Sequence, residues 1–523
     1  MNSDLHKTKI VRDTIVVVQK EEGEMKKTLV VPMVLLSMIL LFSTSVRLSR
    51  ASTTPILGTA APLGYSSDPV KFQEITSVED ALADPTPWNV DIIDAEATSN
   101  DGEGIYVAVL DTGLLSNYLE FFPESMVDIK EEWGVGFTHD VWYDPDGEGN
   151  WSIEYVDSTE YKFSYKPVND GRGFLTYDDG YPLWAYYPPA GFDIPFPYGS
   201  GHGTHVTSIV TGYQFERGPV SAWIAGVAPK VTIIPVLVLD DWIVFADDGN
   251  GWWWSGGTDE MVAAGIRYIG DLAAAHGIKI IINMSLGGGS PSPLDEAAID
   301  YAISQGVIVV ASAGNEGEEG MGWPGAFTQV ISCAAAGWTQ EYGAGYYDYY
   351  WWWGDVPEKL NTVNYVYDPW TEITYKNNWQ TYLVDFSSRP NPDLGQSWKD
   401  LDVSAPGCAI RGPYKPYGAT QWGFYAVWGT SQAAPHVSGI AALLLQSYPY
   451  LGQAAVEAIL KNAATGVPMP ADGAYISDTF SDFAVWYYWW NDHDAGSGFL
   501  TVDEVFKAAK TSRGAHLCVL RFR

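Results

Sequence analysis

Residues 278–315 read IKIIINMSLGGGSPSPLDEAAIDYAISQGVIVVASAGN, and this stretch decides the fold class. Residues 278–284 and 307–311 are short apolar runs rich in Ile and Val, as in buried parallel strands. Between them, residues 294–306 have the apolar spacing of a helix and end at a glycine. A strand, a helix and a second strand in this order predict parallel strands joined by crossover helices.

The same alternation extends along the chain in both directions. Residues 105–111 (IYVAVLD) and 231–240 (VTIIPVLVLD) are apolar runs that each end in a carboxylate. Helical spacing recurs in four further segments: residues 258–277, the run after Ser431, and residues 454–464 and 501–510. We therefore predict an α/β fold with a mostly parallel central sheet.

Two long segments interrupt this pattern, at about residues 124–197 and 338–383. Both are acidic and aromatic and lack clean periodicity. Because strands of the same type resume after each one, we interpret them as insertions in one domain. The predicted organisation is an N-terminal extension, an arm, one α/β domain and a tail, at residues 1–51, 52–86, 87–510 and 511–523.

Composition and charge limit the classes of partner. The chain has 523 residues, a formal net charge of -35 and a sequence pI of about 4.3. Such a chain is repelled by nucleic acid and by anionic membrane surfaces, so we predict neither as a partner. Hydrophobic residues make up 46% of the chain, which is enough for a sizeable core.

The N-terminal region resembles a secretory signal. Lys26 and Lys27 precede the apolar run 29–42, which is shorter than a membrane span, and residues 49–51 offer a cleavage site. We predict a secreted or extracellular protein. The alternative is an uncleaved signal that anchors it at the cell surface, which would be its only membrane contact.

The chain has three cysteines, Cys333, Cys408 and Cys518. An odd number leaves at least one cysteine unpaired. Either Cys333 and Cys408 form a disulfide, as secretion permits, or they are small buried apolar residues. The cysteines show none of the spacings typical of zinc sites.

Four segments carry residues suited to catalysis. Asp111 ends the run 105–111, and the carboxyl ends of parallel strands are where α/β sites form. His202 stands between two glycines just before a helix, Asn315 lies on a glycine loop, and Ser431 precedes a long helix. Each also has a structural interpretation, and for Ser431 it is a helix N-cap. We interpret His205 as structural.

Together, the motifs DTG, GHGTHV, INMSLGG, AGN and GTSQAAPHVSG resemble those of the subtilisin-like serine proteases. The order Asp-His-Ser along the chain is that of this family and differs from those of α/β-hydrolases and chymotrypsin-like enzymes. The resemblance covers about residues 87–510 without the two insertions. It implies a three-layer α/β fold and a secreted endopeptidase that acts on protein or peptide substrates.

The resemblance also implies a role for each matching residue. Ser431 would be the nucleophile, His202 the general base and Asp111 the residue that orients His202. The Asn315 side chain would join the Ser431 N–H in stabilising the oxyanion. The substrate would lie against residues of two strand ends: Ser285, Leu286, Gly287, Gly288, Ser312, Ala313 and Gly314.

Two alternatives to a general endopeptidase remain open from the sequence. A surface binding protein on an inactive protease scaffold would require the loss of a triad member, and none is missing. A protease that processes only its own arm is compatible with all three triad residues being present.

Gln432 stands where relatives usually carry Met. Because the oxidisable side chain is absent, we expect the activity of the protein to tolerate peroxide.

The chemistry itself requires no cofactor, but structural calcium is a further expectation. Asp144, Asp146 and Glu148 alternate around glycines in DPDGEGN (residues 144–150), as in a calcium loop. Glu120 lies near the position where the family often has a calcium carboxylate. The alternative interpretation is a solvated acidic turn.

Overall fold

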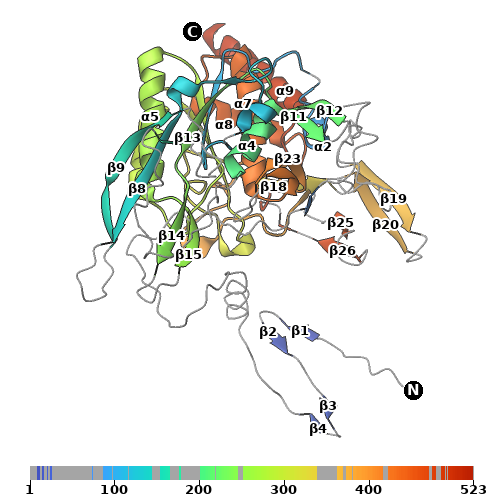
Figure 1. The fold of residues 1–523 in the computed structure, drawn as a ribbon. Coiled ribbons are helices and arrows are strands. Elements are labelled where there is room, and N and C mark those ends of the chain that lie inside the picture. The colour runs from blue at the N-terminus through green and yellow to red at the C-terminus, as the bar shows by residue number, and fades with distance from the viewer. Residues whose placement is uncertain are drawn as a thin grey trace.

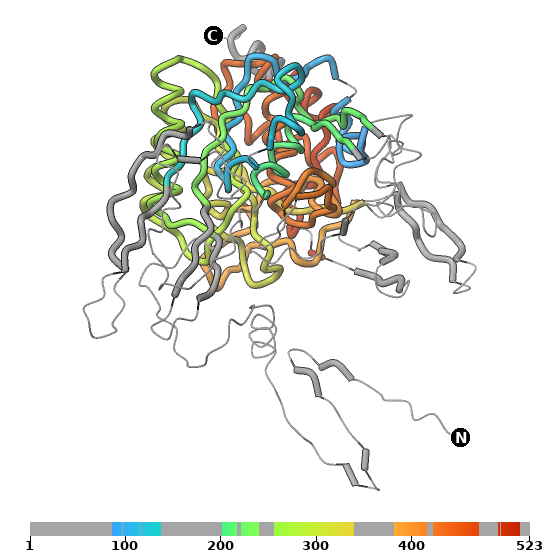
Figure 2. The backbone as a smooth tube through the Cα atoms, in the orientation of Figure 1, coloured from blue at the N-terminus to red at the C-terminus, as the bar shows by residue number. Residues whose placement is uncertain are grey.

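The computed structural model describes backbone and side chains for most of the α/β domain (Figure 2). These residues are 86–96, 98–115, 117–137, 201–216, 221–239, 256–338, 381–415, 422–469, 490–491 and 493–512. Several other strands and the end of the last helix are described by their backbone alone. The signal segment 29–42, most of the arm and the loop 144–150 lie outside the described residues.

A sheet of 11 strands forms the centre of the described structure (Figure 1). Its main path runs β10 (Thr176–Tyr177), β9 (Ile153–Ser164), β8 (Val135–Tyr143), β13 (Thr232–Leu237), β6 (Tyr106–Asp111), β16 (Ile280–Met284), β17 (Ile308–Ser312), β18 (Ile331–Trp338) and β21 (Thr381–Leu383). Two strands join from the side: β7 (Asp128–Ile129) on β13 and β22 (Val403–Pro406) on β18. Pairing is parallel from β8 to β18, which confirms the predicted mostly parallel sheet.

Helices cover both faces of this sheet, because adjacent residues of a strand point to opposite sides. Leu110 of β6 faces α5 (Asp259–His276), since a Cβ added at Gly265 would lie 3.4 Å from its side chain. Asp111 points the other way and contacts His202, the first residue of α4 (His202–Thr211). The helix α6 (Pro293–Ser304) packs on α5, and α7 (Thr430–Ser447) packs on α4 (Figure 1). The result is the predicted three-layer arrangement.

The helix ends follow the signals in the sequence. Thr258 caps α5 by accepting a hydrogen bond from the Met261 N–H, and Gly277 ends the helix with φ 62°. Ser292 caps α6 in the same way, by accepting from the Asp295 N–H. Two further helices, α8 (Gln453–Ala464) and α9 (Val502–Arg521), complete the carboxyl-terminal part.

Parts of the expected insertions continue the sheet or form hairpins. Strand β7 and the start of β8 fall inside the segment 124–197, yet both pair with β13, and Phe137 is buried. Strands β8 and β9 then form an antiparallel hairpin that extends the sheet. In the second segment, β19 (Thr362–Asp368) pairs with β20 (Ile373–Trp379), and β21 pairs with β18.

Smaller elements surround this framework. The short helices are α2 (Trp88–Asp91), α3 (Tyr118–Phe121), η1 (Glu131–Trp133), η2 (Gly317–Glu319) and η3 (Pro392–Leu394). The remaining strands pair as β1 (Lys9–Val11) with β2 (Thr14–Val16), β3 (Lys20–Glu21) with β4 (Glu24–Met25), β11 (Gly212–Arg217) with β12 (Val220–Ala225), β14 (Asp240–Phe245) with β15 (Gly251–Gly256), β23 (Ile410–Tyr414) with β24 (Gly423–Val427) and β5 (Gln73–Glu74), and β25 (Ala474–Asp478) with β26 (Ala484–Tyr488).

The disulfide alternative is wrong, because Cys333 and Cys408 are buried thiols that form no disulfide. Each thiol has its own contacts: Cys333 Sγ lies 3.4 Å from the Ala334 carbonyl oxygen, and Cys408 Sγ lies 3.3 Å from the Tyr382 hydroxyl. Burial raises the pKa of the Cys333 thiol. Both residues therefore act as small apolar side chains. Cys518 lies in α9 where only the backbone is described.

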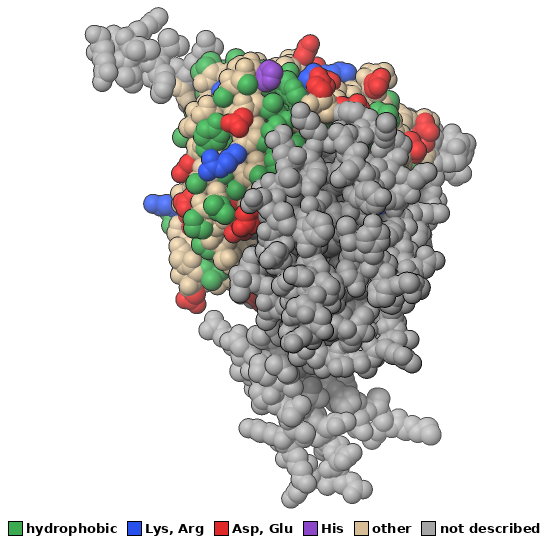
Figure 3. Space-filling view, turned by 60° about the vertical axis from the view of Figure 1, so that its left-hand side comes forward, with side chains coloured by type: hydrophobic (Ala, Val, Ile, Leu, Met, Phe, Trp, Pro, Cys, Tyr) green, Lys and Arg blue, Asp and Glu red, His purple; other side chains and the backbone are tan. Residues whose placement is uncertain are grey.

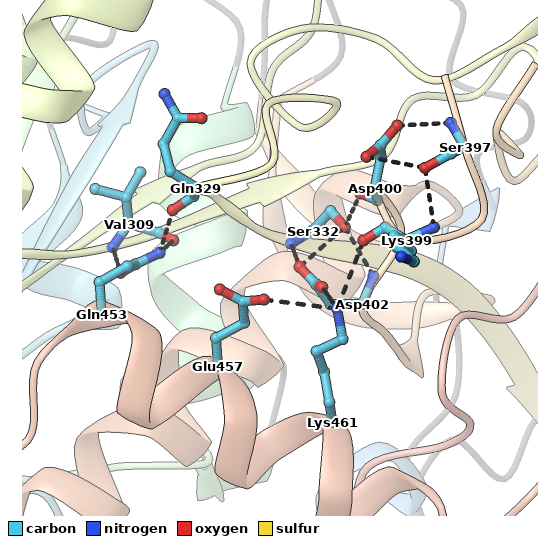
Figure 4. A network of polar contacts seen from close by, with 10 residues as sticks. All are labelled: Val309, Gln329, Ser332, Ser397, Lys399, Asp400, Asp402, Gln453, Glu457 and Lys461. Atoms are coloured by element: carbon cyan, nitrogen blue, oxygen red, sulfur yellow. Dashed lines mark hydrogen bonds and ion pairs between the residues drawn. The ribbon is translucent and has the colours of Figure 1, made fainter. Parts of the chain in front are cut away.

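Polar side chains of α8 hold strands β17, β18 and β22 in place (Figure 4). Gln453 bonds both the N–H and the carbonyl of Val309 in β17, at 2.8 and 3.1 Å. The Lys461 Nζ lies 2.6 Å from the buried Asp402 carboxylate, which also accepts from the Ser332 N–H of β18. Burial raises the pKa of Asp402, and its bonds to Lys461 and Ser332 oppose that shift. The two bonds from Gln453 thus fix β17, the strand that leads into Asn315.

The described surface carries charges of both signs. On the face drawn in Figure 3, acidic and basic side chains are interspersed with apolar and neutral ones. Among the described helices, none combines the length and the apolar composition needed to cross a bilayer.

Candidate active site

Asp111 and His202 form a buried pair at the carboxyl end of the sheet. The His202 Nδ1 lies 2.9 Å from both carboxylate oxygens of Asp111, and the two residues are 3% and 0% exposed. The Thr112 N–H also donates to Asp111 Oδ1, at 2.7 Å. Because a carboxylate accepts hydrogen bonds, this geometry favours the His202 tautomer with its proton on Nδ1. In that tautomer the lone pair of the ring is on Nε2.

Glycine at position 203 allows this pair to form. A Cβ added there would lie 2.3 Å from the Gly113 carbonyl oxygen and 3.2 Å from Asp111 Oδ1, so a larger residue would separate α4 from the end of β6. The Gly203 N–H donates to Thr112 Oγ1 at 3.0 Å, which fixes the approach. The GHG and DTG motifs thus pack against each other.

Ser431 is the second residue of α7, and Gly429 occupies the N-cap position. The prediction that Ser431 lies at a helix start is confirmed, but the N-cap interpretation is wrong. The Ser431 hydroxyl does not cap the helix but donates to the Ser285 carbonyl oxygen, at 3.2 Å.

A chain of buried polar side chains positions the backbone at Ser431. The Ser285 hydroxyl donates to the Ser431 carbonyl oxygen at 2.7 Å and accepts from Asn283 Nδ2 at 3.0 Å. The Ser438 hydroxyl in α7 donates to Asn283 Oδ1 at 2.8 Å. The sequence motifs assign Ser285 only to the pocket wall and do not mark Asn283 or Ser438. The available signal is the polar residue within each of the otherwise apolar stretches INM and VSGIA.

Asn315 is oriented by Thr430, the residue before Ser431. Its Oδ1 accepts from the Thr430 N–H at 2.9 Å and lies 3.0 Å from the Thr430 hydroxyl, so its Nδ2 points elsewhere. A Cβ added at Gly429 would lie 3.8 Å from that Nδ2 and 3.6 Å from the Ser431 nitrogen. Both nitrogens thus lie near Gly429, and Asn315 and Ser431 line the same cavity, as an oxyanion site requires.

A cavity of about 470 Å³ opens beside Ser431 and Asn315. Its lining includes every predicted wall residue except Ala313: Ser285, Leu286, Gly287, Gly288, Ser312 and Gly314. Ala313 is fully buried behind the wall, where its N–H and carbonyl bond Cys333 and Gly322. The rest of the lining includes Glu316, residues 319–322 and Leu394. The sequence does not predict these residues, because their position depends on tertiary packing.

His205 lies inside α4 and is fully buried, as its structural interpretation requires. Its Nε2 lies 3.2 Å from the Ile410 carbonyl oxygen. Burial lowers the pKa of His205 to about 3, so the ring stays neutral. It does not take part in the chemistry considered below.

Of the predicted calcium ligands, Glu120 is the one that lies among the described residues. Glu120 is exposed on α3. In the described part of the chain, no group of three or more His, Cys, Asp or Glu residues could hold a metal ion. Asp144, Asp146 and Glu148 lie outside the described residues.

Comparison with known proteins identifies the family. The model of the subtilase family matches residues 102–483. The chain is 30% identical to a subtilisin from Bacillus sp. (strain TA39) over 313 residues, which are 58% of this chain and 57% of that protein. It is 28% identical to fervidolysin from Fervidobacterium pennivorans over 401 residues, 73% of this chain and 45% of that protein. It thus spans about half the length of these two relatives.

A solved structure, sphericase, aligns at 24% identity with a TM-score of 0.45, covering 80% of this chain and 99% of that one. The family model covers well over half of the chain, and its span contains Asp111, His202, Asn315 and Ser431. The chain therefore belongs to the subtilase family.

Proposed function

We propose that the chain is a secreted serine endopeptidase that hydrolyses proteins or peptides through an acyl-enzyme on Ser431. The observation that carries this proposal is the buried Asp111–His202 pair, whose Nδ1 lies 2.9 Å from both carboxylate oxygens. It orients His202 on a helix that packs against the one carrying Ser431, and a ring with its proton on Nδ1 has its basic nitrogen at Nε2.

In the proposed mechanism, the Ser431 hydroxyl turns from the Ser285 carbonyl toward His202 Nε2 and gives it a proton as Oγ attacks the scissile carbonyl. The hydrogen bond between a catalytic serine and its base is often long until substrate binds. The imidazolium is stabilised by Asp111 and returns the proton to the leaving amine. Water then attacks the acyl-enzyme, with His202 again as the base, and releases the acid product.

The oxyanion of each tetrahedral intermediate would accept hydrogen bonds from the Ser431 N–H and from Asn315 Nδ2. Both nitrogens lie near Gly429, and the amide of Asn315 is already oriented by Thr430. Ser431 also lies in the first turn of the 18-residue helix α7, whose N-terminus favours negative charge.

Replacing Asn315 with alanine should lower kcat by about 10²–10³, the range known for this donor in subtilisin itself, with little change in KM. Steady-state kinetics on a chromogenic peptide anilide measure both constants. Asn100→Ala is the control, because the Asn100 side chain donates to the Leu443 carbonyl at 2.9 Å and does not line the cavity. A kcat for Asn315→Ala within about threefold of wild type would contradict the oxyanion role.

Casein digestion tests the function as a whole. The purified chain should release peptides from added casein, whereas Ser431→Ala should not. Cleavage of the chain's own arm with intact casein would restrict the activity to self-processing. Retained casein cleavage by Ser431→Ala would refute the proposal.

Gln432 is buried beside the proposed nucleophile, and its Oε1 would lie 2.7 Å from a Cβ added at Gly429. Because this position holds no sulfur, mild peroxide should leave most activity intact, whereas Gln432→Met should lose activity progressively under the same treatment. Residual activity after timed exposure measures the difference. Equal rates of inactivation in the two proteins would contradict this prediction.

Secretion and structural calcium belong to the same proposal. Export would depend on the apolar segment 29–42, and calcium would be held by Asp144, Asp146 and Glu148 in the first insertion. Neither enters the proposed bond-breaking steps.

A further inference from the structure

We infer that the enzyme prefers a lysine or arginine side chain immediately before the scissile bond, and that Glu319 selects it. This inference rests on the proposed function and adds the substrate class. It is carried by the charge and shape of the cavity beside Ser431.

Two of the segments that form the walls of the cavity are joined side by side. One segment is residues 285–289, after β16, and the other is residues 319–322. The Gly288 N–H donates to the Trp323 carbonyl at 2.7 Å, and the Trp323 N–H donates to the Gly288 carbonyl at 2.9 Å. Because Ser431 and Asn315 line the same cavity, a side chain next to the reacting carbonyl would enter this cavity.

The walls suit a long aliphatic stem. Leu286 and Met321 are each 2% exposed, and both line the cavity. Gln396 fixes Met321 from both sides, since its Oε1 accepts from the Met321 N–H at 2.8 Å and its Nε2 donates to the Met321 carbonyl at 2.7 Å. The methylene groups of lysine or arginine pack against such surfaces while the charged end reaches a polar group.

The charged groups of the cavity are both acidic. Glu316 and Glu319 line it, and its lining contains no lysine, arginine or histidine among the described residues. Glu318, between them in sequence, is not part of the lining. Its carboxylate lies 3.0 Å from Arg389 Nη1, so a cation already offsets its charge.

Glu316 and Glu319 differ in how their carboxylates are used. Glu316 Oε2 accepts from the Asn315 N–H at 2.7 Å and from the Ser388 hydroxyl at 2.9 Å. A Cβ added at Gly314 would lie 2.5 Å from this oxygen, so the carboxylate is fixed against the wall. Glu316 therefore supports Asn315 as well as contributing charge.

The Glu319 carboxylate has no ion pair or hydrogen bond with any other described residue, while its backbone is fixed by a 3.0 Å bond from Asn391 Nδ2 to its carbonyl. A cationic substrate side chain would supply the missing counter-charge. Glu319 is exposed, so the solvent weakens the interaction, and we expect a preference of about two- to fivefold that falls with added salt.

The test compares kcat/KM for four peptides that differ only in the residue before the scissile bond: lysine, arginine, norleucine and glutamate. Norleucine keeps the aliphatic stem of lysine without its charge. Wild type should cleave the lysine and arginine peptides about two- to fivefold faster than the norleucine peptide, and the glutamate peptide most slowly. Glu319→Gln should reduce the lysine-to-norleucine ratio by about the same factor.

Glu318→Gln is the matched control, because it removes the same charge one residue away and outside the cavity. The lysine-to-norleucine ratio of kcat/KM for this variant should equal that of wild type. A wild-type ratio near one, or equal shifts in the two variants, would overturn the inference. If all four peptides are cleaved at similar rates, only the specificity is wrong. If none of the four peptides is cleaved, the proposed function itself is wrong.

Discussion

Ser431→Ala is expected to lower kcat for peptide hydrolysis by about 10⁶, close to the loss known for the nucleophile of subtilisin itself. The variant keeps the oxyanion donors and the cavity but has no oxygen to form the acyl-enzyme. Steady-state kinetics on a peptide anilide measure the loss, and circular dichroism with thermal melting checks that the fold is retained.

A second serine of the same helix provides the control. Ser447 lies at the far end of α7, where its hydroxyl accepts from Asn100 Nδ2 at 2.7 Å. Ser447→Ala should keep wild-type kcat. If Ser431→Ala retained more than about 1% of wild-type kcat, Ser431 could not be the nucleophile.

Asp111→Asn is expected to lower kcat by about 10⁴, the loss known for the equivalent change in trypsin. The asparagine amide has the shape of the carboxylate but can donate to His202 Nδ1. It thereby favours the tautomer whose proton is on Nε2, which cannot accept the serine proton. It also removes the negative charge that stabilises the imidazolium.

Asp128→Asn tests whether any carboxylate of the sheet would have the same effect. Asp128 lies on β7 and accepts from the Thr232 hydroxyl of β13 at 2.7 Å, away from His202. Its replacement should change kcat by less than about twofold. Similar losses in the two variants would show that Asp111 acts through stability and not through His202.

Much of the fold could be predicted because its signals are local. The apolar runs of β6, β13, β16 and β17 are short and continuous, as buried parallel strands require. Thr258 and Ser292 both cap the helices that follow them. Each of these features depends on residues a few positions apart.

The rest depended on contacts between distant residues. Strands β7 and β8 join the sheet only through β13, about 100 residues later in sequence, and nothing local marks that pairing. Whether Cys333 and Cys408 form a disulfide likewise depends on where the sheet and its loops place the two thiols.

The residues of the candidate site also fall into two groups: those that the local sequence marks and those whose role depends on contacts between distant residues. Asp111, His202, Asn315 and Ser431 stand in glycine-containing motifs, and the sequence marks all four. Asn283 and Ser438 resemble ordinary strand and helix residues, and only the structure shows that they position Ser285 and hence Ser431. The position of Glu319 in the cavity depends on the folding of residues 316–323 against Gly288.

Reaction with a fluorophosphonate tests the central claim most directly, because only an activated serine forms the covalent adduct. Mass spectrometry of the digested, labelled chain should find a single adduct on Ser431 in wild type, none in Ser431→Ala and a much slower reaction in Asp111→Asn. A folded wild-type chain that forms no adduct, or forms it on a different serine, would contradict the account.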